Sequence, residues 1–433
     1  MNHAAMHLRS GRSLIASALL LSICALSHAD SAKTGAWPVR ADAVGTEAGF
    51  SAAGLEALDA RMKAAVEKKD IAGAVTLLSH KGKVAAFNTY GTQSLDAGSA
   101  PMSDDTIFRI YSMTKPITGV AIMQLYEKGL WKLDDPVTKY VPELAGLKVV
   151  KGKDAEGKPI LVDLARPATM KELMTHTAGF GYGLQPGNPA DDGFIAKQPL
   201  GKPDLKALVD TVAEIPLLAQ PGERWSYSIA VDIQGLIVER LSGEKFGDYL
   251  RNHIFQPLSM SETTFALDAK AEPRVATVYR WDAPTSALVP TGDKWGPRVM
   301  PLDSGGGGLY STMHDYARFC QMLLNQGTLD GKQVLKSETV ALMTQNHIGE
   351  LKLFGGLPGT GFGLDFAVIT DPAALKSAQG EGSYWWFGIA GTWFWVDPKN
   401  DLFFVGLIQR RLDGGTTALR NESVKLVYEA LQK

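Results

Sequence analysis

Hydrophobic and polar positions near residue 50 of the 433-residue chain predict a helix followed by a β-hairpin. Ser51 is of the residue type that caps helix N-termini, so the helix is expected to begin there. The apolar positions on one face of this helix are Leu55, Leu58, Met62 and Val66. Two β-rich runs, residues 72–79 and 83–90, flank His80-Lys81-Gly82. A glycine in such a short connection indicates a hairpin turn.

A second pattern occupies residues 131–300, where short helical patterns are separated by proline, glycine and aspartate. A strand is predicted near its end, over residues 275–281. Helices are predicted over residues 170–175, 205–215 and 229–241. Long connections such as residues 181–201 commonly carry functional sites. We therefore predict a mainly helical domain over residues 131–300.

The last part of the chain, residues 301–433, returns to mixed helical and strand patterns. Predicted helices cover residues 313–325, 337–343 and 416–431. Predicted strands cover residues 363–370, 383–388, 391–396 and 402–408. Short turns between these strands indicate consecutive antiparallel pairing. We predict an α+β fold in which residues 30–130 and 301–433 form a domain with an antiparallel sheet flanked by helices, and a functional site lies between the two domains.

Residues 1–29 have the pattern of a secretory signal peptide. Arg9 and Arg12 are their only formal charges, and an apolar stretch over residues 14–26 ends in Ser27-His28-Ala29. Cleavage is expected after Ala29, which predicts an exported protein, periplasmic or secreted. The stretch is too short to span a bilayer, and no other run reaches the roughly 18 apolar residues that a span needs. A lipoprotein signal at Cys24 is disfavoured because the residue before it, Ile23, is not small.

The charge and the cysteine content of the chain bear on two questions: whether it binds nucleic acid, and whether it contains a disulfide. The formal net charge is −2, and it becomes −4 when the predicted leader removes two of 44 basic residues against 46 acidic ones. No basic run is present, which disfavours a nucleic-acid partner. Cys320 is the one cysteine after the leader, so no internal disulfide is expected. It lies in an amphipathic helical pattern and is interpreted as a small buried hydrophobe.

The candidate chemistry begins at Ser112-x-x-Lys115, directly before the apolar run over residues 117–125. On a helix, residues three apart share a face with their Cβ atoms about 5–6 Å apart. A helix N-terminus also favours negative charge. The pair therefore supplies a nucleophile with an adjacent amine. The alternative is that Ser112 is a cap and Lys115 a solvated side chain.

Other routes to an active serine are less well supported. No Gly-x-Ser-x-Gly elbow occurs in the chain, which argues against an α/β-hydrolase site. The histidines beyond the leader are His80, His176, His253, His314 and His347. None has the spacing of a zinc site, so no metal is predicted. His176 is the best candidate for a histidine base, although a structural role at a helix end is favoured for it. No cofactor is implied.

Three ordered motifs together resemble those of penicillin-binding proteins and serine β-lactamases. Ser112-Met113-Thr114-Lys115 resembles their S-x-x-K motif, and Trp225-Ser226-Tyr227-Ser228-Ile229 resembles the segment of their catalytic tyrosine. Trp386-Phe387-Gly388 stands where their K-T-G strand is expected. The pattern is most similar to that of family VIII carboxylesterases, which have a class C β-lactamase-like fold, and it covers the chain from about Ser51 to the end.

The resemblance implies the roles of the candidate site residues. Ser112 would be the nucleophile, with Lys115 or Tyr227 as the base that takes its proton, and the two are not distinguished. The backbone N–H groups of Ser112 and Ile389 would bind the oxyanion. The remaining residues expected to contact substrate are Tyr111, Trp225, Trp386 and Gly388.

Two departures from the lactamase pattern bear on the substrate. Class C lactamases carry Tyr-x-Asn where this chain has Tyr227-Ser228-Ile229, and isoleucine cannot hydrogen-bond an amide. The lysine of K-T-G is replaced by Trp386. Loss of a charge-assisted hydrogen bond costs about 1.5–3 kcal/mol for an anionic substrate. The expected function is therefore a serine carboxylesterase that hydrolyses neutral, short-chain, small-molecule esters.

Two alternatives remain from the sequence. The same Ser-Lys-Tyr chemistry could serve a β-lactamase, a D,D-peptidase or an amide hydrolase. A protein of the same fold could instead bind a ligand without catalysis. All three motifs keep groups that can perform the chemistry, which favours an enzyme.

Overall fold

The computed structural model describes residues 37–38, 45–292 and 300–432. The predicted signal peptide, residues 1–29, lies outside the described residues. From Trp37 onward the chain forms one compact unit. Within the described ranges, no helix has the length and apolar character needed to cross a bilayer. The two-domain division drawn from the sequence stays a prediction.

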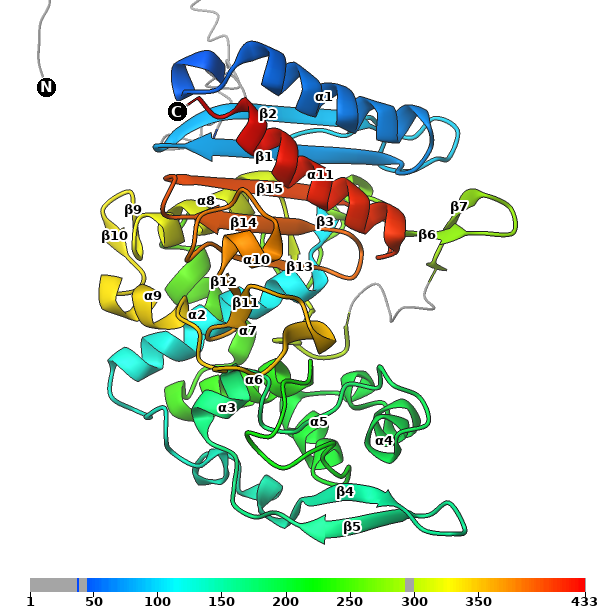
Figure 1. The fold of residues 1–433 in the computed structure, drawn as a ribbon, viewed down its shortest axis with the longest axis vertical. Helices are drawn as coiled ribbons and strands as arrows, with labels where there is room; N and C mark the ends of the chain where they lie inside the picture. The colour runs from blue at the N-terminus through cyan, green and yellow to red at the C-terminus, as the bar shows by residue number, and fades with distance from the viewer. Residues whose placement is uncertain (1–36, 39–44, 293–299, 433) are drawn as a thin grey trace, which may run out of the picture. The chain divides into compact units, whose positions relative to one another are not determined.

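A seven-stranded antiparallel sheet draws its strands from both ends of this unit (Figure 1). In spatial order the strands are β11 (Thr360–Phe362), β12 (Ala367–Ile369), β13 (Tyr384–Phe387), β14 (Trp393–Asp397), β15 (Leu402–Ile408), β1 (Gly73–His80) and β2 (Lys83–Gly91). The last strand, β15, pairs with the first, β1, with Leu77 opposite Val405. The segments at either end of the chain therefore share one sheet.

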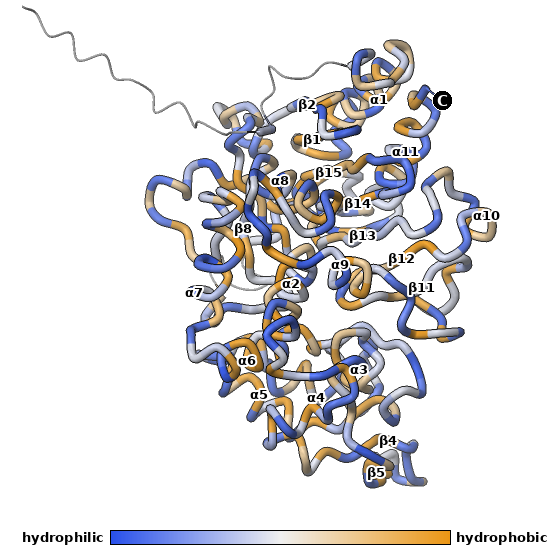
Figure 2. Tube along the Cα trace, turned by 90° about the vertical axis from the view of Figure 1, so that its left-hand side faces the viewer, coloured by the Kyte–Doolittle hydropathy of each residue, from blue (hydrophilic) through white to orange (hydrophobic). Residues whose placement is uncertain are grey.

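Helices pack on both faces of the sheet (Figure 1). On one face, α1 (Ala52–Glu67) packs against α11 (Gly414–Ala430), and Leu58, Val427 and Trp395 belong to one apolar cluster. On the other face, α8 (Met313–Leu324) contacts β1, β14 and β15, and α2 (Thr114–Glu127) shares its apolar cluster. Figure 2 shows hydrophobic stretches along the central strands and α2. Strand alternation thus separates two apolar layers.

The remaining elements complete an α+β fold, which confirms the predicted class. Further helices are α3 (Met170–Met174), α4 (Pro189–Lys197), α5 (Leu205–Val212), α6 (Ala230–Ser242), α7 (Phe246–Leu250), α9 (Ser337–Met343) and α10 (Pro372–Leu375). Short helical turns are η2 (Gly45–Ala48), η3 (Tyr111–Met113), η4 (Val137–Lys139), η5 (Pro142–Gly146), η6 (Pro199–Gly201), η7 (Arg251–Phe255), η8 (Glu272–Arg274) and η10 (Leu353–Gly355). Two-stranded pairs are β3 (Phe108–Arg109) with β8 (Tyr310–Ser311), β4 (Lys148–Lys153) with β5 (Pro159–Asp163), β6 (Tyr279–Asp282) with β7 (Ala287–Pro290), and β9 (Thr328–Leu329) with β10 (Lys332–Gln333).

The local predictions at the start of the chain are confirmed. Ser51 is the N-cap of α1, and its side chain accepts a hydrogen bond from the Gly54 amide at 3.2 Å. Strands β1 and β2 form the predicted hairpin, whose turn places Lys81 and Gly82 at positive φ. Cys320 is fully buried in α8, as expected of a small hydrophobe.

Two strand boundaries were predicted wrongly. The expected strand over residues 363–370 is interrupted, because Gly363 to Phe366 form a turn in which Asp365 has a φ of 67°. Only Ala367–Ile369 pairs within the sheet as β12, and the strand before the turn is β11. The expected strand over residues 275–281 begins only at Tyr279, in β6. In both cases tertiary contacts overrode the local β preference.

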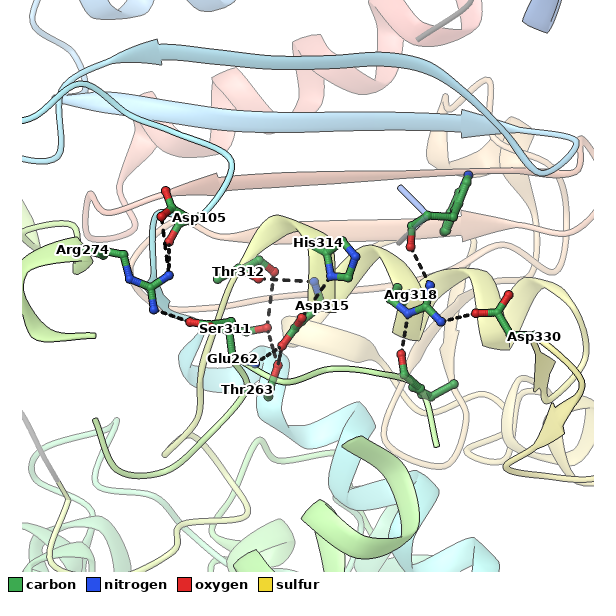
Figure 3. Close-up of polar contacts among 12 residues, drawn as sticks. Asp105, Glu262, Thr263, Arg274, Ser311, Thr312, His314, Asp315, Arg318 and Asp330 are labelled. Atoms are coloured by element: carbon green, nitrogen blue, oxygen red, sulfur yellow. Dashed lines mark hydrogen bonds and ion pairs between the residues drawn. The ribbon is translucent and has the colours of Figure 1, made fainter. Parts of the chain in front are cut away.

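Polar contacts anchor α8, the helix beneath the sheet (Figure 3). Asp315 accepts hydrogen bonds from the Glu262 amide at 2.8 Å and from Thr263 Oγ1 at 2.9 Å. Arg318 is buried, pairs with Asp330, and donates to the Trp37 carbonyl at 2.6 Å. Because buried charges need partners, these bonds fix the position of α8 relative to the segments that it contacts. The first turn of α8 in turn supports the segment that carries Ser112.

Candidate active site

Ser112 lies in a tight turn, η3, at the entrance to α2. Tyr111 begins this turn with a φ of 44°. Three contacts hold the turn from outside. Ile110 donates its amide to the Leu309 carbonyl at 3.1 Å, and the Leu309 amide donates to Thr114 Oγ1 at 3.2 Å. Tyr316 of α8 donates its hydroxyl to the Met113 carbonyl at 2.9 Å. The serine is therefore presented on a rigid support.

Tyr227 reaches Ser112 from a segment 115 residues further along the chain. Its Oη donates to Ser112 Oγ at 2.6 Å. The loop that carries the tyrosine is tied on both sides: the Ser226 amide donates to the His176 carbonyl at 2.9 Å, and the Ile229 amide donates to the Gly181 carbonyl at 3.1 Å. Helix α6, which follows this loop, packs against α2. The structure thus brings together the predicted nucleophile and the predicted tyrosine.

Lys115 lies one helical turn beyond Ser112 and is 1% exposed. Its Nζ donates to the Gly306 carbonyl at 2.6 Å. The same atom lies 4.5 Å from the ring centre of Tyr227 and 5.1 Å from that of Tyr182. Cations bind aromatic faces through the ring quadrupole. The alternative of a solvated lysine is therefore wrong, and the amine contacts the tyrosine rather than water.

Lys115 acts electrostatically on two buried carboxyl groups, Asp232 and Asp365, and the sequence analysis identified neither. Burial raises the pKa of Asp232, and the nearby Lys115 lowers it. Burial raises the pKa of Asp365 well above its ordinary value, against the effects of Gln234 and Lys115. Asp232 could have been noticed as the acidic residue within the apolar start of α6. Asp365 gave no such signal, because it lies in a turn that interrupts a predicted strand.

His176 supports the tyrosine loop and has no hydrogen bond to Ser112 among the described residues. Its Nδ1 lies 2.9 Å from Ser228 Oγ, and its ring centre lies 5.0 Å from that of Tyr227. The residue follows α3 with a φ of 58°. Burial and, to a lesser extent, Lys115 hold its pKa well below the ordinary value, so the imidazole is neutral. These contacts agree with the structural role favoured from the sequence.

The end of strand β13 approaches the serine turn closely at Gly388. A Cβ atom on Gly388 would lie 2.4 Å from both the Ile110 carbonyl oxygen and Thr392 Oγ1. The Gly388 amide already donates to the Thr392 carbonyl at 2.8 Å. The next amide, that of Ile389, has no hydrogen-bond partner within the described ranges. The oxyanion role of Ser112 and Ile389 stays a prediction, and this geometry leaves the Ile389 N–H available for it.

An aromatic cluster lies beside Tyr227 and changes the expected pocket. Trp386 was expected to form an aromatic wall, but it is only 1% exposed. Phe354 of η10 stacks over it with ring centres 5.7 Å apart, and is itself 45% exposed. Phe354 also lies 5.0 Å from Trp225. Phe354 is therefore the most exposed of these three rings, and the sequence analysis did not identify it as a site residue.

Tyr111 is also predicted to contact substrate. Its ring lies beside the guanidinium of Arg109, with 4.5 Å between Arg109 Cζ and the ring centre. Burial raises the pKa of the Tyr111 phenol. Tyr111 is the first residue of the serine turn and directly precedes Ser112 in the chain. No group of three or more histidine, cysteine, aspartate or glutamate side chains within the described residues is arranged to hold a metal.

We expect Gly388→Ala to slow the reaction of Ser112 with a fluorophosphonate probe by about tenfold to a hundredfold, because the added methyl group would push β13 away from the serine turn and misplace an oxyanion donor. The measurement is the rate of covalent labelling. Gly414→Ala is the control, since a Cβ atom there meets nothing within 4 Å. Equal labelling rates for both variants would contradict the close-approach argument.

Comparisons with known proteins agree with this geometry. The Beta-lactamase family model matches residues 58–429. Protein Rv1367c of Mycobacterium tuberculosis strain H37Rv is 38% identical over 78% of this chain and 86% of its own length. Esterase EstB of Burkholderia gladioli is 31% identical over 84% of this chain and 93% of its own length. The solved structure of EstCE1, described as a hydrolase with promiscuous acyltransferase activity, is 26% identical, with a TM-score of 0.74 and coverage of 87% of this chain and 98% of that one. The resemblance drawn from the motifs is thereby confirmed, and the chain belongs to the Beta-lactamase family.

Proposed function

We propose that the protein is a serine carboxylesterase that hydrolyses neutral, short-chain esters through an acyl-enzyme on Ser112. The observation that carries this proposal is the 2.6 Å hydrogen bond between Tyr227 Oη and Ser112 Oγ, with Lys115 Nζ 4.5 Å from the centre of the same tyrosine ring. A nucleophile, a proton acceptor and a nearby cation are the parts that an activated serine requires. No cofactor enters this chemistry.

The geometry supports a two-step reaction. Ser112 Oγ attacks the ester carbonyl carbon while its proton passes to Tyr227, which enters the step as the phenolate, and the carbonyl oxygen becomes an oxyanion bound by backbone N–H groups. Tyr227 then gives the proton to the leaving alkoxide as the C–O bond breaks. In the second step the tyrosine takes a proton from water, the resulting hydroxide attacks the acyl carbon, and the proton returns to Ser112. Each step leaves the proton count of the site unchanged.

The surroundings of the serine favour a neutral substrate. Trp386 stands where the resemblance expects a lysine that would pair with a substrate carboxylate, and it is buried under Phe354. Ile229, in place of the expected asparagine, is fully buried and offers no side-chain donor. A substrate anion would therefore lose its hydration without gaining a charged partner at these positions. The relatives named as esterases support an ester as the substrate.

We expect Ser112→Ala to abolish turnover of p-nitrophenyl butyrate, because the acyl-enzyme can no longer form. Tyr227→Phe keeps the ring against Lys115 but removes the hydroxyl, and should lower kcat by about a hundredfold to ten-thousandfold. The measurements are kcat and KM, with circular dichroism to check the fold. Tyr140→Phe is a matched control, since its hydroxyl is bound to Leu130 and Asp135, away from the serine. Hydrolysis retained by the serine variant would refute the proposal.

The ester preference is tested by comparing p-nitrophenyl butyrate with nitrocefin on the same preparation. We expect kcat/KM for the ester to exceed that for the lactam by at least about a hundredfold, which corresponds to roughly 2.7 kcal/mol of transition-state discrimination. A ratio near one, or in favour of nitrocefin, would support the lactamase alternative. Failure of both substrates together with failure of fluorophosphonate labelling would support a ligand-binding protein.

We further propose that the enzyme works outside the cytoplasm after removal of residues 1–29. The support is the leader pattern itself: two arginines, an apolar stretch and the small residues before Asp30. Mass spectrometry of the protein from an expressing bacterium should find a mature N-terminus at Asp30 in the periplasm or medium. A full-length chain that stays in the cytoplasm would contradict this assignment.

A further inference from the structure

A cavity of about 670 Å³ is enclosed by α11, by the end of α10 with the residues that follow it, and by strands β13 and β14. Trp385 of β13 lines this cavity, whereas the ring of the next residue, Trp386, lies 5.5 Å from that of Tyr227. Successive side chains of a strand point to opposite faces of the sheet. The cavity therefore lies across β13 from the catalytic tyrosine, and its volume is typical of small-molecule sites.

Four aromatic side chains share the face of β13 and β14 at this cavity. Trp385 pairs with Trp395, and Phe387 pairs with Trp393. Residues directly opposite each other in an antiparallel pair lie on the same face. The three tryptophans line the cavity, and Phe387 packs against the apolar cluster to which Trp393 and Trp395 belong. Aromatic walls of this kind favour a flat apolar ligand that can stack on them.

Arg420 of α11 brings a guanidinium group to these rings. Its Cζ lies 4.3 Å from the centre of the Phe387 ring and 5.9 Å from that of Trp385. Contacts of a cation with aromatic faces hold the guanidinium in place. Its Nη1 is buried and has no hydrogen-bond partner among the described residues, and no carboxylate in these ranges forms an ion pair with it.

The charge of Arg420 is therefore left without compensation. Burial lowers the pKa of Arg420 to about 10, which still leaves the side chain protonated at neutral pH. A buried cation without an opposite charge is unfavourable, because it has lost hydration and gained no partner. An anion that entered the cavity would supply the missing partner.

The remaining charges at the cavity bear on which anion fits. Lys376 and Lys425 are exposed lining residues, and Glu429 forms an ion pair with Lys425 at 3.7 Å. This excess of cations attracts anions to the entrance. Inside, one guanidinium among apolar walls favours a single negative charge, since a second charge would lose its hydration without a partner. A carboxylate is the monoanion whose two oxygens match the guanidinium fork.

We propose that this cavity is a binding site, separate from the active site, for a carboxylate with a flat aromatic body. The carboxylate accepts hydrogen bonds from the guanidinium of Arg420, and the aromatic body lies against Trp385. The site uses none of the residues assigned to ester hydrolysis. It can therefore be tested whether or not the protein hydrolyses esters.

The test is isothermal titration calorimetry of the full chain with 2-naphthoate. We expect binding with a Kd of about 1 mM or lower, as a ligand of this size can reach. The matched ligand is 2-naphthamide, which keeps the ring system and removes the charge. Its Kd should be at least about tenfold higher, because it cannot form the charge-assisted hydrogen bonds.

Arg420→Met removes the guanidinium but keeps an apolar side chain against Phe387, and should raise the Kd for 2-naphthoate by about tenfold to a hundredfold. The control is Arg61→Met, which removes the same charge from an arginine that pairs with Glu422 of α11 and does not line the cavity. Its Kd should stay within about twofold of the wild-type value.

Asn421→Trp tests the location of the site without changing its charge, and decides the question if Arg420→Met does not fold. Asn421 is an exposed residue of α11 that lines the cavity, so an indole there should fill part of the space and raise the Kd at least about tenfold. No binding of 2-naphthoate to the wild-type protein would overturn the proposal. Equal affinity for the acid and the amide, or wild-type affinity in the folded Arg420 or Asn421 variants, would also overturn it.

Discussion

The hydrogen bond between Tyr227 and Ser112 is the contact on which the rest of the site depends, because neither residue has a reactive hydroxyl by itself. An isolated serine is a weak nucleophile, and an isolated phenol is mostly protonated at neutral pH. Their 2.6 Å contact joins the entrance of α2 to the loop before α6. The packing of α2 against α6 holds these two segments together. Lys115 is buried beside them, with its Nζ 4.5 Å from the centre of the Tyr227 ring.

The sheet contributes through one close backbone approach. Strand β13 ends at Phe387, and Gly388 then meets the carbonyl of Ile110 with no room for a side chain. The strand is held by antiparallel pairing with β12 and β14, so the position of the Ile389 amide is set by a rigid element. Sites built on rigid elements keep their geometry better than sites on loops. Phe354, by contrast, lies on a short turn and is 45% exposed.

Short-range patterns were sufficient for much of the fold. The N-cap at Ser51, the β1–β2 hairpin and the strand Leu402–Ile408 depend on neighbours in the sequence, and each was predicted. The strand expected across Asp365 failed because that residue turns into the interior to face Gln234 on α6, a contact 131 residues distant. Long-range contacts of this kind leave no periodic signal in a single sequence.

The sequence by itself determined which groups could do the chemistry, because the order and spacing of Ser112, Lys115 and Tyr227 already specify a nucleophile, an amine and a phenol. Only the tertiary structure decided what these groups are to one another. In the folded chain, Lys115 Nζ donates to the Gly306 carbonyl and lies against the Tyr227 ring. Phe354 stacks on Trp386, and Asp232 accepts a hydrogen bond from the Gly306 amide. The reason is that charge states depend on burial and on the nearest opposite charge, and both arise when distant segments pack together.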